Sequence, residues 1–275
     1  MSEQFAEVNG IKLCYEIKGE GEPLILVHGF GAKKEEWICQ YEELSKHFKV
    51  IRFDNRGAGK SDRPSIPFTM DMFSDDLAGL MDFLKIEKAN IVGWSLGGMI
   101  VQNFTLKYPE KVKTMILINT NHKGAGGELY KKMRHEGLDV LLKDPAKYFW
   151  DGARNSHHMT FRKQMEKDPK KMWFGLWSAE WKMNENTINP STHDDIDYQA
   201  NALETHNTLD RLKTIKAPTL LITASHDRLT PKSCMEEIHN EIPNSKLVVI
   251  EKAGHGSPLS RADEVNQAIL DFLKE

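Results

Sequence analysis

A single serine stands among glycines directly after an apolar run in the stretch NIVGWSLGGMI, residues 90–100. Gly93 and Gly97 lie two positions before and two positions after Ser95. A strand that turns sharply into a helix holds its corner residue in a strained backbone conformation, so the neighbouring side chains must be small. The pattern therefore predicts an exposed, nucleophilic hydroxyl on Ser95. A plain glycine-rich turn capped by this serine is the alternative.

A serine hydroxyl becomes a useful nucleophile only when a base, itself held by a carboxylate, takes its proton. Asp227 follows the apolar run at residues 219–223, and His255 follows the run at residues 246–250. Both positions lie just past predicted strands, where open α/β sheets place their functional groups. We therefore expect His255 to be the base and Asp227 to be the acid that orients it.

Other histidines compete for the role of base. His226 neighbours the acid, but its side chain should point elsewhere, and His28 is expected to be a structural histidine beneath a loop. Four more lie in a polar segment of helical character, where solvated helix faces are expected: His157, His158, His193 and His206.

Glycines also follow the apolar run at residues 23–27, in the sequence HGFG at residues 28–31. They would let the backbone amide of Phe30 face inward, where it pairs with the amide of Leu96. Two such donors stabilise the oxyanion of a tetrahedral intermediate. A simple tight turn is the alternative interpretation of these glycines.

Short apolar runs of strand length alternate with helical patterns along most of the chain. The runs are at residues 23–27, 50–53, 90–92, 115–118, 219–223 and 246–250, and the helical patterns are at residues 71–84, 99–108 and 258–273. This alternation predicts an α/β fold whose mostly parallel, doubly wound sheet is covered by helices on both faces. Residues 6–8 and 11–17 predict a hairpin at one edge. Thr230-Pro231 resembles the N-cap and first position of a further helix.

The alternation stops over residues 122–205, which we interpret as an insertion that holds four of the six tryptophans. Trp173, Trp177 and Trp181 repeat at four-residue spacing, so on a helix they would form one aromatic stripe. Such a stripe either packs the insertion against itself or against the main domain, or it lines an apolar acyl pocket that faces the serine. These three residues, and Trp94 beside the serine, are candidate substrate contacts.

The chain of 275 residues has a net charge of −3 and interspersed acidic and basic residues. Nothing in this pattern indicates a nucleic-acid partner or a membrane-binding patch. The N-terminus lacks the pattern of a signal peptide, so the scattered Cys14, Cys39 and Cys234 are expected to be reduced thiols in a cytoplasmic protein. No metal or organic cofactor is expected, and the sequence has no clustered spacing of metal ligands.

Four ordered motifs and an acid resemble the α/β-hydrolase fold superfamily: HGFG at residues 28–31, DNRGAGKS at 54–61, GWSLGG at 93–98 and AGH at 253–255, with the acid at Asp227. The resemblance implies an α/β-hydrolase core domain of residues 1–121 and 206–275. It also implies that residues 122–205 form a helical cap, or lid, over the active site.

Departures from related families narrow the activity that this resemblance implies. Haloalkane dehalogenases and epoxide hydrolases carry aspartate where Ser95 stands, and proline iminopeptidases carry tryptophan where Leu96 stands. Carbon–carbon bond hydrolases usually carry tryptophan after the catalytic histidine, where this chain has Gly256. The chain looks like carboxylesterases and 3-oxoadipate enol-lactonases. That likeness implies hydrolysis of a small, partly apolar ester or lactone through an acyl-enzyme.

Three further activities remain open for a chain with these motifs. A ligand-sensing receptor of the same fold would close its lid on a small molecule and hydrolyse it slowly. A cofactor-free haloperoxidase would use the same triad, and so would a carbon–carbon bond hydrolase.

Overall fold

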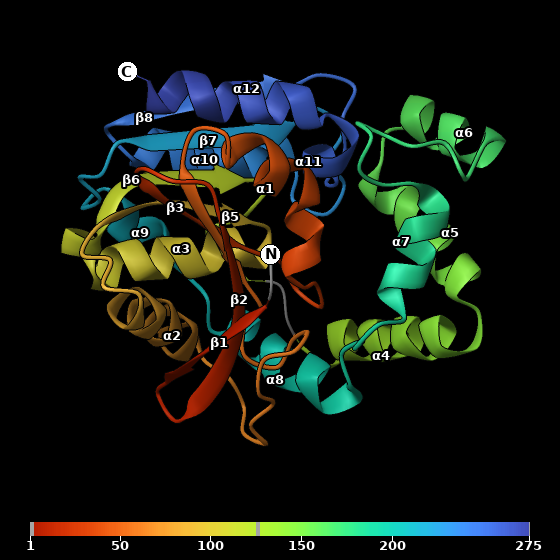
Figure 1. The fold of residues 1–275 in the computed structure, drawn as a ribbon, viewed down its shortest axis with the longest axis horizontal. Coiled ribbons are helices and arrows are strands. Elements are labelled where there is room, and N and C mark those ends of the chain that lie inside the picture. Colours follow the sequence, from red (N-terminus) through yellow and green to blue (C-terminus); the bar gives the residue numbers. More distant parts are fainter. Residues whose placement is uncertain (1–2, 125–126, 275) are drawn as a thin grey trace.

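The computed structural model describes residues 3–124 and 127–274. Its central feature is one twisted sheet with the strand order β1-β2-β4-β3-β5-β6-β7-β8 (Figure 1). The strands are β1 (Gln4–Val8), β2 (Ile11–Lys18), β3 (Pro23–Val27), β4 (Lys49–Phe53), β5 (Ala89–Trp94), β6 (Val112–Ile118), β7 (Thr219–Ala224) and β8 (Ser245–Ile250). Strands β3 to β8 run parallel, whereas β2 pairs antiparallel with both β1 and β4. The predicted edge hairpin is therefore present.

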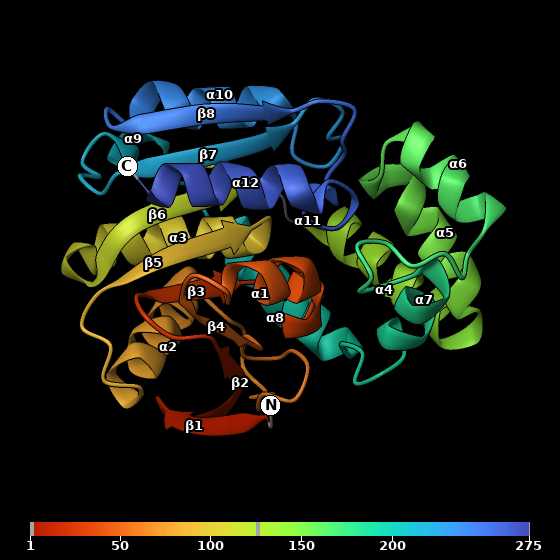
Figure 2. The same cartoon turned by 45° about the horizontal axis from the view of Figure 1, so that its top comes forward.

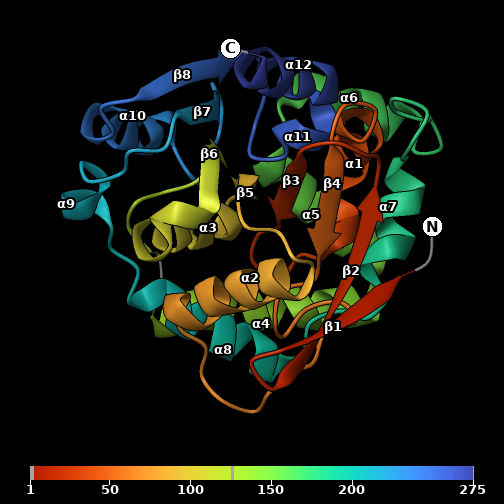
Figure 3. The ribbon, with the colours of Figure 1, turned by 60° about the vertical axis from the view of Figure 1, so that its left-hand side comes forward.

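Helices cover both faces of this sheet. On one face α2 packs against α3, with α10 on the same side, and on the other face α1 packs against α12 (Figure 3). The helices of the core are α1 (Ile38–Leu44), α2 (Met70–Phe83), α3 (Leu96–Lys107), α9 (Leu209–Leu212), α10 (Lys232–Glu241), α11 (Ser257–Ser260) and α12 (Ala262–Leu273), with 3-10 turns at Lys34–Trp37 and Pro109–Lys111. The prediction of a mostly parallel, doubly wound α/β sheet is confirmed.

The chain between β6 and β7 leaves the sheet and forms further helices, the last of which, α8, returns to the core, while the others lie apart from the sheet (Figures 1 and 2). The helices of this segment are α4 (Glu128–Lys143), α5 (Pro145–Ser156), α6 (Met159–Lys167), α7 (Ala179–Asn186) and α8 (His193–Glu204). An antiparallel bridge between Lys123 and Asn207 joins the outgoing and returning segments. These helices correspond to the predicted insertion. We keep the name cap for residues 122–205, whose boundaries and lid role remain a prediction.

A tight turn, rather than a helix, carries two of the three spaced tryptophans. The amide of Trp173 donates a hydrogen bond of 2.7 Å to the carbonyl of Trp177. Phe174 and Gly175 between them have φ angles of 53° and 70°. The predicted helical stripe is therefore wrong, because Gly175 favours a reversal of the chain over a helix here. Of the three, Trp181 alone lies on a helix, α7.

Two predicted helix boundaries also differ. The segment 258–273 breaks at Arg261, whose φ and ψ of −135° and 43° separate α11 from α12. Pro231, instead of Thr230, is the N-cap of α10. The Thr230 hydroxyl bonds a carboxylate in the site described below.

The sulfur atoms of Cys14 and Cys39 lie in buried positions. Burial raises the pKa of the Cys14 thiol to about 11 and that of the Cys39 thiol to about 12. Both thiols therefore stay protonated and unreactive at neutral pH. Among the described residues, no helix combines the length and apolar character that crossing a bilayer requires.

Candidate active site

Ser95 stands at the corner between β5, which ends at Trp94, and α3, which begins at Leu96. Its φ and ψ angles are 58° and −121°, a region that costs a residue with a side chain of order 1–3 kcal/mol. The close approach of the backbone explains the flanking glycines. A Cβ atom on Gly93 would lie 2.4 Å from the carbonyl oxygen of Gly97, and one on Gly97 would lie 2.0 Å from that of Val27.

Neighbouring strand ends hold this corner in place. The amide of Ser95 donates to the carbonyl of Ile118 at 3.0 Å, and its carbonyl accepts a hydrogen bond of 2.6 Å from the Thr120 hydroxyl. The side chain of Ser95 is only partly buried. These contacts fix the corner at Ser95, and the hydroxyl of Ser95 stays within reach of a bound molecule.

Asp227 and His255 form a buried pair beyond the ends of β7 and β8. Nδ1 of His255 donates to Oδ2 of Asp227 at 2.8 Å, and the two residues are each 8 % exposed. Oδ1 of the carboxylate accepts from the amides of Leu229 at 2.8 Å and Thr230 at 2.9 Å. Burial alone raises the pKa of Asp227, but His255 and the Thr230 donors outweigh it and lower the pKa below the usual value. Asp227 is therefore ionised and fixes the proton of His255 on Nδ1, which leaves Nε2 as an acceptor.

Trp94, which precedes Ser95, and Asn119, which follows β6, hold the backbone of His255. Its carbonyl oxygen accepts one hydrogen bond of 3.0 Å from the indole N–H of Trp94 and another of 2.8 Å from Nδ2 of Asn119. The ring of Trp94 also lies 6.0 Å from that of His255. Trp94 was a candidate substrate contact. Its side chain is 8 % exposed and, through its hydrogen bond, supports the backbone of His255.

The amides of Phe30 and Leu96 donate no hydrogen bond to any other residue in the described part of the chain. Leu96 is the first residue of α3, where helix amides lack intrahelical partners. The loop of Phe30 lies against the serine, because a Cβ atom on Gly29 would come within 3.1 Å of the Ser95 Cβ atom. Both amides are thus free to bind an oxyanion.

Contacts from the cap reach the Phe30 loop. The amide of Gly31 donates to Oε1 of Gln199 on α8 at 3.0 Å. The Phe30 ring packs edge-on against Tyr130 at 5.4 Å, and the Arg134 guanidinium lies 4.6 Å above it. The cap therefore borders the site on this side.

The cap tryptophans pack at the junction between cap and core. Trp177 is completely buried and lies 6.0 Å from the ring of Phe161 and 6.4 Å from that of His157. Trp173 lies 4.3 Å from Phe161, and both Trp173 and Trp181 are partly exposed. Trp177 therefore packs in one cluster with buried residues of both cap and core, which is the packing role considered for the spaced tryptophans.

The remaining histidine expectations meet different outcomes. His28 is buried and its Nε2 accepts from the amide of Asn55 at 2.9 Å, so it supports a loop as expected. His157 and His206 differ from the solvated faces expected for them. His206 is 3 % exposed, and Nδ1 of His157 is buried without a hydrogen-bond partner.

Glu3, Glu16 and Glu35 form a cluster that could hold a cation, with oxygens within 4.8 Å of one another. The ammonium of Lys34 already lies among them, 2.7 Å from Glu35 and 3.2 Å from Glu3. Burial alone lowers the pKa of Lys34, but Asp54 and Glu35 raise it above the ordinary value. The cluster therefore neutralises a buried lysine of the chain itself.

Sequence reasoning missed Thr230 and Asn119. The Thr230 hydroxyl donates to Asp227 at 2.8 Å, and Asn119, with a φ angle of 44°, bonds His255 and accepts from the amide of Ala224 at 2.9 Å. A polar residue directly after the apolar run of β6 was the signal available for Asn119. Thr230 gave a misleading signal, because a threonine before a proline is also typical of a helix start.

Comparison with known proteins gives one consistent result. The family model described as alpha/beta hydrolase fold matches residues 22–262. The 2-hydroxy-6-oxo-6-phenylhexa-2,4-dienoate hydrolase of Comamonas testosteroni is 29% identical over 274 residues, which cover 98% of this chain and 93% of that protein. The enol-lactonase from Burkholderia xenovorans LB400 is 26% identical with a TM-score of 0.83, covering 99% of this chain and 100% of that one. A thermophilic esterase from Thermogutta terrifontis is 27% identical with a TM-score of 0.83, covering 100% of this chain and 98% of the other.

Proposed function

The chain belongs to the α/β-hydrolase fold family, and from that premise we propose that it is a serine hydrolase that cleaves a carboxylic ester or lactone. The substrate is small and partly apolar, and the carboxylic acid part is carried by an acyl-enzyme. The proposed triad is Ser95, His255 and Asp227. The enol-lactonase and the esterase named above, similar over nearly their whole lengths, support this substrate class.

The reaction proceeds in two steps at the Ser95 hydroxyl. Nε2 of His255 takes the proton from Oγ while Oγ attacks the carbonyl carbon, and Asp227 stabilises the imidazolium that forms. The amides of Phe30 and Leu96 bind the oxyanion of the tetrahedral intermediate. The imidazolium then protonates the leaving alkoxide, and the carbonyl re-forms as the acyl-enzyme. Water attacks the acyl group with His255 again as the base, which releases the acid and restores the hydroxyl of Ser95.

The observation that carries this proposal is the backbone of Ser95, with φ of 58° and ψ of −121°. A capping serine in an ordinary turn needs no such angles, since N-cap residues have extended backbones. Ser95 makes no side-chain capping bond to α3. The strain therefore supports the nucleophile over the plain cap.

A second candidate is a carbon–carbon bond hydrolase, and the Comamonas testosteroni relative favours it. The substrate in the name of that relative is a 6-oxo acid. Hydrolysis next to a ketone breaks a carbon–carbon bond. The same serine, base and oxyanion donors would serve that reaction, so the substrate decides between the two.

The test measures turnover of p-nitrophenyl esters of increasing acyl length, a lactone panel and a 2-hydroxy-6-oxo-dienoate by the wild-type protein and by Ser95→Ala. Triad members act as a unit, so Ser95→Ala is expected to lower kcat/KM for an ester or lactone on the order of 10⁴-fold. Hydrolysis of the oxo-dienoate alone would favour the second candidate. Very slow hydrolysis of every compound, with a rise in melting temperature on binding, would favour the receptor.

A further inference from the structure

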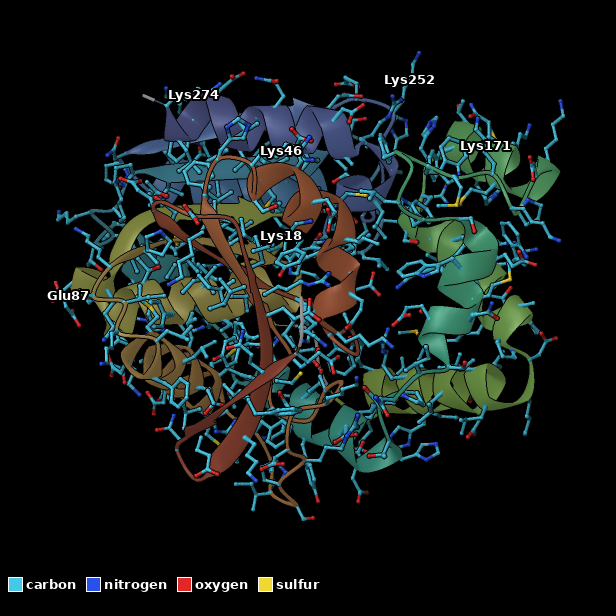
Figure 4. The ribbon with its side chains drawn as sticks, viewed as in Figure 1. Lys18, Lys46, Glu87, Lys171, Lys252 and Lys274 are labelled. Carbon is cyan, nitrogen blue, oxygen red and sulfur yellow. The ribbon has the colours of Figure 1, made fainter. Side chains whose placement is uncertain are left out.

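The end of helix α5 in the cap meets the loop that carries His255. The amide of Gly256 donates a hydrogen bond of 2.7 Å to the carbonyl oxygen of Ser156, the last residue of α5. This bond joins the cap to the residue that follows the proposed base. Figure 4 labels Lys252, on the core loop that precedes His255, and Lys171, on the cap segment that follows α6.

Glycines on both sides of His255 make room for this contact. A Cβ atom on Gly254 would lie 2.7 Å from the carbonyl oxygen of Ser156. A Cβ atom on Gly256 would lie 2.5 Å from Cε1 and 2.8 Å from Nδ1 of the His157 ring. Gly256 has φ of −80° and ψ of 28°, which any residue can adopt. Its lack of a side chain therefore serves the close approach of His157.

The imidazole of His157 fills the space over Gly256. It stacks on Trp177, with an interplanar angle of 23°, and lies 5.4 Å from the ring of Phe161. Burial, with smaller contributions from Lys182 and His255, lowers the pKa of His157 to about 4. The ring is therefore neutral at neutral pH and adds no positive charge beside His255 when an imidazolium forms there.

His158, the residue after His157, contacts the loop that carries Asp227. The ring of His158 lies 4.6 Å from that of His226, which precedes Asp227. The corner formed by Ser156, His157 and His158 thus touches both loops that carry the proposed base and acid.

We propose that this cap corner, through Ser156 and His157, is a positioning element for His255. The inference rests on the proposed function, because it assumes that His255 is the base for Ser95. The hydrogen bond to Gly256 and the packing of His157 add support from the cap to the loop of His255, whose carbonyl Trp94 and Asn119 hold from the core. His157 is a positioning residue and touches no reacting atom.

The test compares His157→Ala, Gly256→Ala and the double variant. Two rates are measured: kcat on the best ester of the panel, and labelling of Ser95 by a fluorophosphonate, in which Oγ displaces fluoride from phosphorus. Labelling needs an activated serine but no natural substrate. A displacement of about 1 Å in a catalytic group costs up to about 10²-fold, so each single variant is expected to lower both rates at least tenfold, with KM changed less than about twofold.

The double variant gives the sharper result. The three atoms nearest to a methyl group added at Gly256 all belong to the His157 ring, and His157→Ala removes them. Gly256→Ala should therefore cost less than about twofold in the His157→Ala background. Two losses that multiply, or single variants that fold and keep wild-type rates, would overturn the proposal.

Matched controls come from the same part of the chain. Gly152→Ala adds a methyl group on α5 that meets no atom within 4 Å beyond its chain neighbours and the backbone of its own helix, and it should leave both rates unchanged. His157→Phe keeps a ring of similar size and should keep at least half of the labelling rate. A folded His157→Phe variant with the low rate of His157→Ala would contradict the packing basis.

The same experiment separates the two proposals. If Ser95 of the wild-type protein is labelled rapidly but the protein hydrolyses no ester or lactone, the proposed function is wrong. The labelling rates of the variants then still test the role of His157. A Ser95 that resists labelling in the wild-type protein overturns both.

Discussion

The hydroxyl of Thr230 donates a hydrogen bond of 2.8 Å to Oδ2 of Asp227, the oxygen that also accepts from Nδ1 of His255. Thr230 Oγ1 itself lies 3.2 Å from that nitrogen. The hydroxyl therefore helps to hold the carboxylate against Nδ1 of the imidazole. Thr230 is thus a third member of the hydrogen-bonded group formed with Asp227 and His255.

Thr230→Val should lower kcat modestly, on the order of 3- to 10-fold, because one hydrogen bond to a charged group is worth about 1.5–3 kcal/mol and only part of that acts on the orientation of His255. The shape of the side chain is kept, but the buried carboxylate of Asp227 loses a donor, so the melting temperature should also fall by a few degrees. The measurement is kcat against pH for the wild type and Thr230→Val, with Thr230→Ser as the control that retains the hydroxyl. Equal loss in Thr230→Ser and Thr230→Val would show that the methyl group, and not the hydroxyl, matters.

His255→Ala should match Ser95→Ala in its loss of ester hydrolysis. Asp227→Asn should also be severe, since an amide that turns its N–H toward His255 makes Nδ1 the acceptor and moves the ring proton to Nε2. The protonated Nε2 cannot take the proton of Ser95. Steady-state kinetics on the best ester measure both losses, and wild-type rates in either folded variant would refute the assigned pair.

Leu96→Pro should lower kcat on the order of 10²-fold or more, because proline removes one of the two proposed oxyanion donors. The first position of a helix accepts proline without loss of an intrahelical hydrogen bond. Leu96→Ala keeps the amide and is the matched control, with mild effects expected. The variant must show a native circular dichroism spectrum, and full activity in such a protein would exclude the Leu96 amide from the site.

Trp177→Ala should destabilise the protein by about 3–5 kcal/mol, as truncation of a fully buried aromatic side chain does. Its profile of activity against acyl length should keep its shape, because Trp177 packs between cap and core. Urea unfolding and the ester series measure these two effects.

The half-buried Trp173 and Trp181 are the remaining candidates for an acyl pocket. Such a pocket would favour medium over short acyl chains by roughly 0.8 kcal/mol per buried methylene, and alanine at a residue that lines it should reduce that difference.

The free energy of unfolding should fall as the pH is lowered from about 6.5 to about 4, because His206 is buried and neutral in the folded protein. Burial lowers the pKa of His206 to about 4, and Asn103 donates to its Nδ1 at 2.9 Å, which leaves no acceptor for a second proton. The unfolded chain, with a histidine pKa near about 6.5, binds more protons in this window, so acid favours unfolding. The loss begins near the unfolded pKa and is complete near the folded one.

Urea unfolding at pH 7 and pH 5 should show a loss on the order of 1–2 kcal/mol from this group. In His206→Gln the loss should shrink by that amount, whereas the exposed His47→Gln should leave it unchanged. An equal loss in the wild type and His206→Gln would mean that His206 does not cause the pH dependence.

The sequence by itself determined the elements of the core and the positions of Ser95, Asp227 and His255 along it. These features depend on short stretches: apolar runs define strands, and the spacing of Gly93 and Gly97 defines a sharp corner at the serine. Parallel strands bring their carboxyl ends to one edge, so residues that follow β5, β7 and β8 meet without further information. Local steric rules were therefore sufficient for this part.

The tertiary structure alone decided how the cap joins this core. The spacing of the tryptophans suggested a helix, but Gly175 permits a turn there that buries Trp177. The polar neighbours of His157 suggested a solvated face, whereas its ring packs against Gly256, which follows β8 near the C-terminus. Which of two locally reasonable conformations a segment adopts depends on the surface that it covers. That surface forms only when distant parts of the chain have folded together.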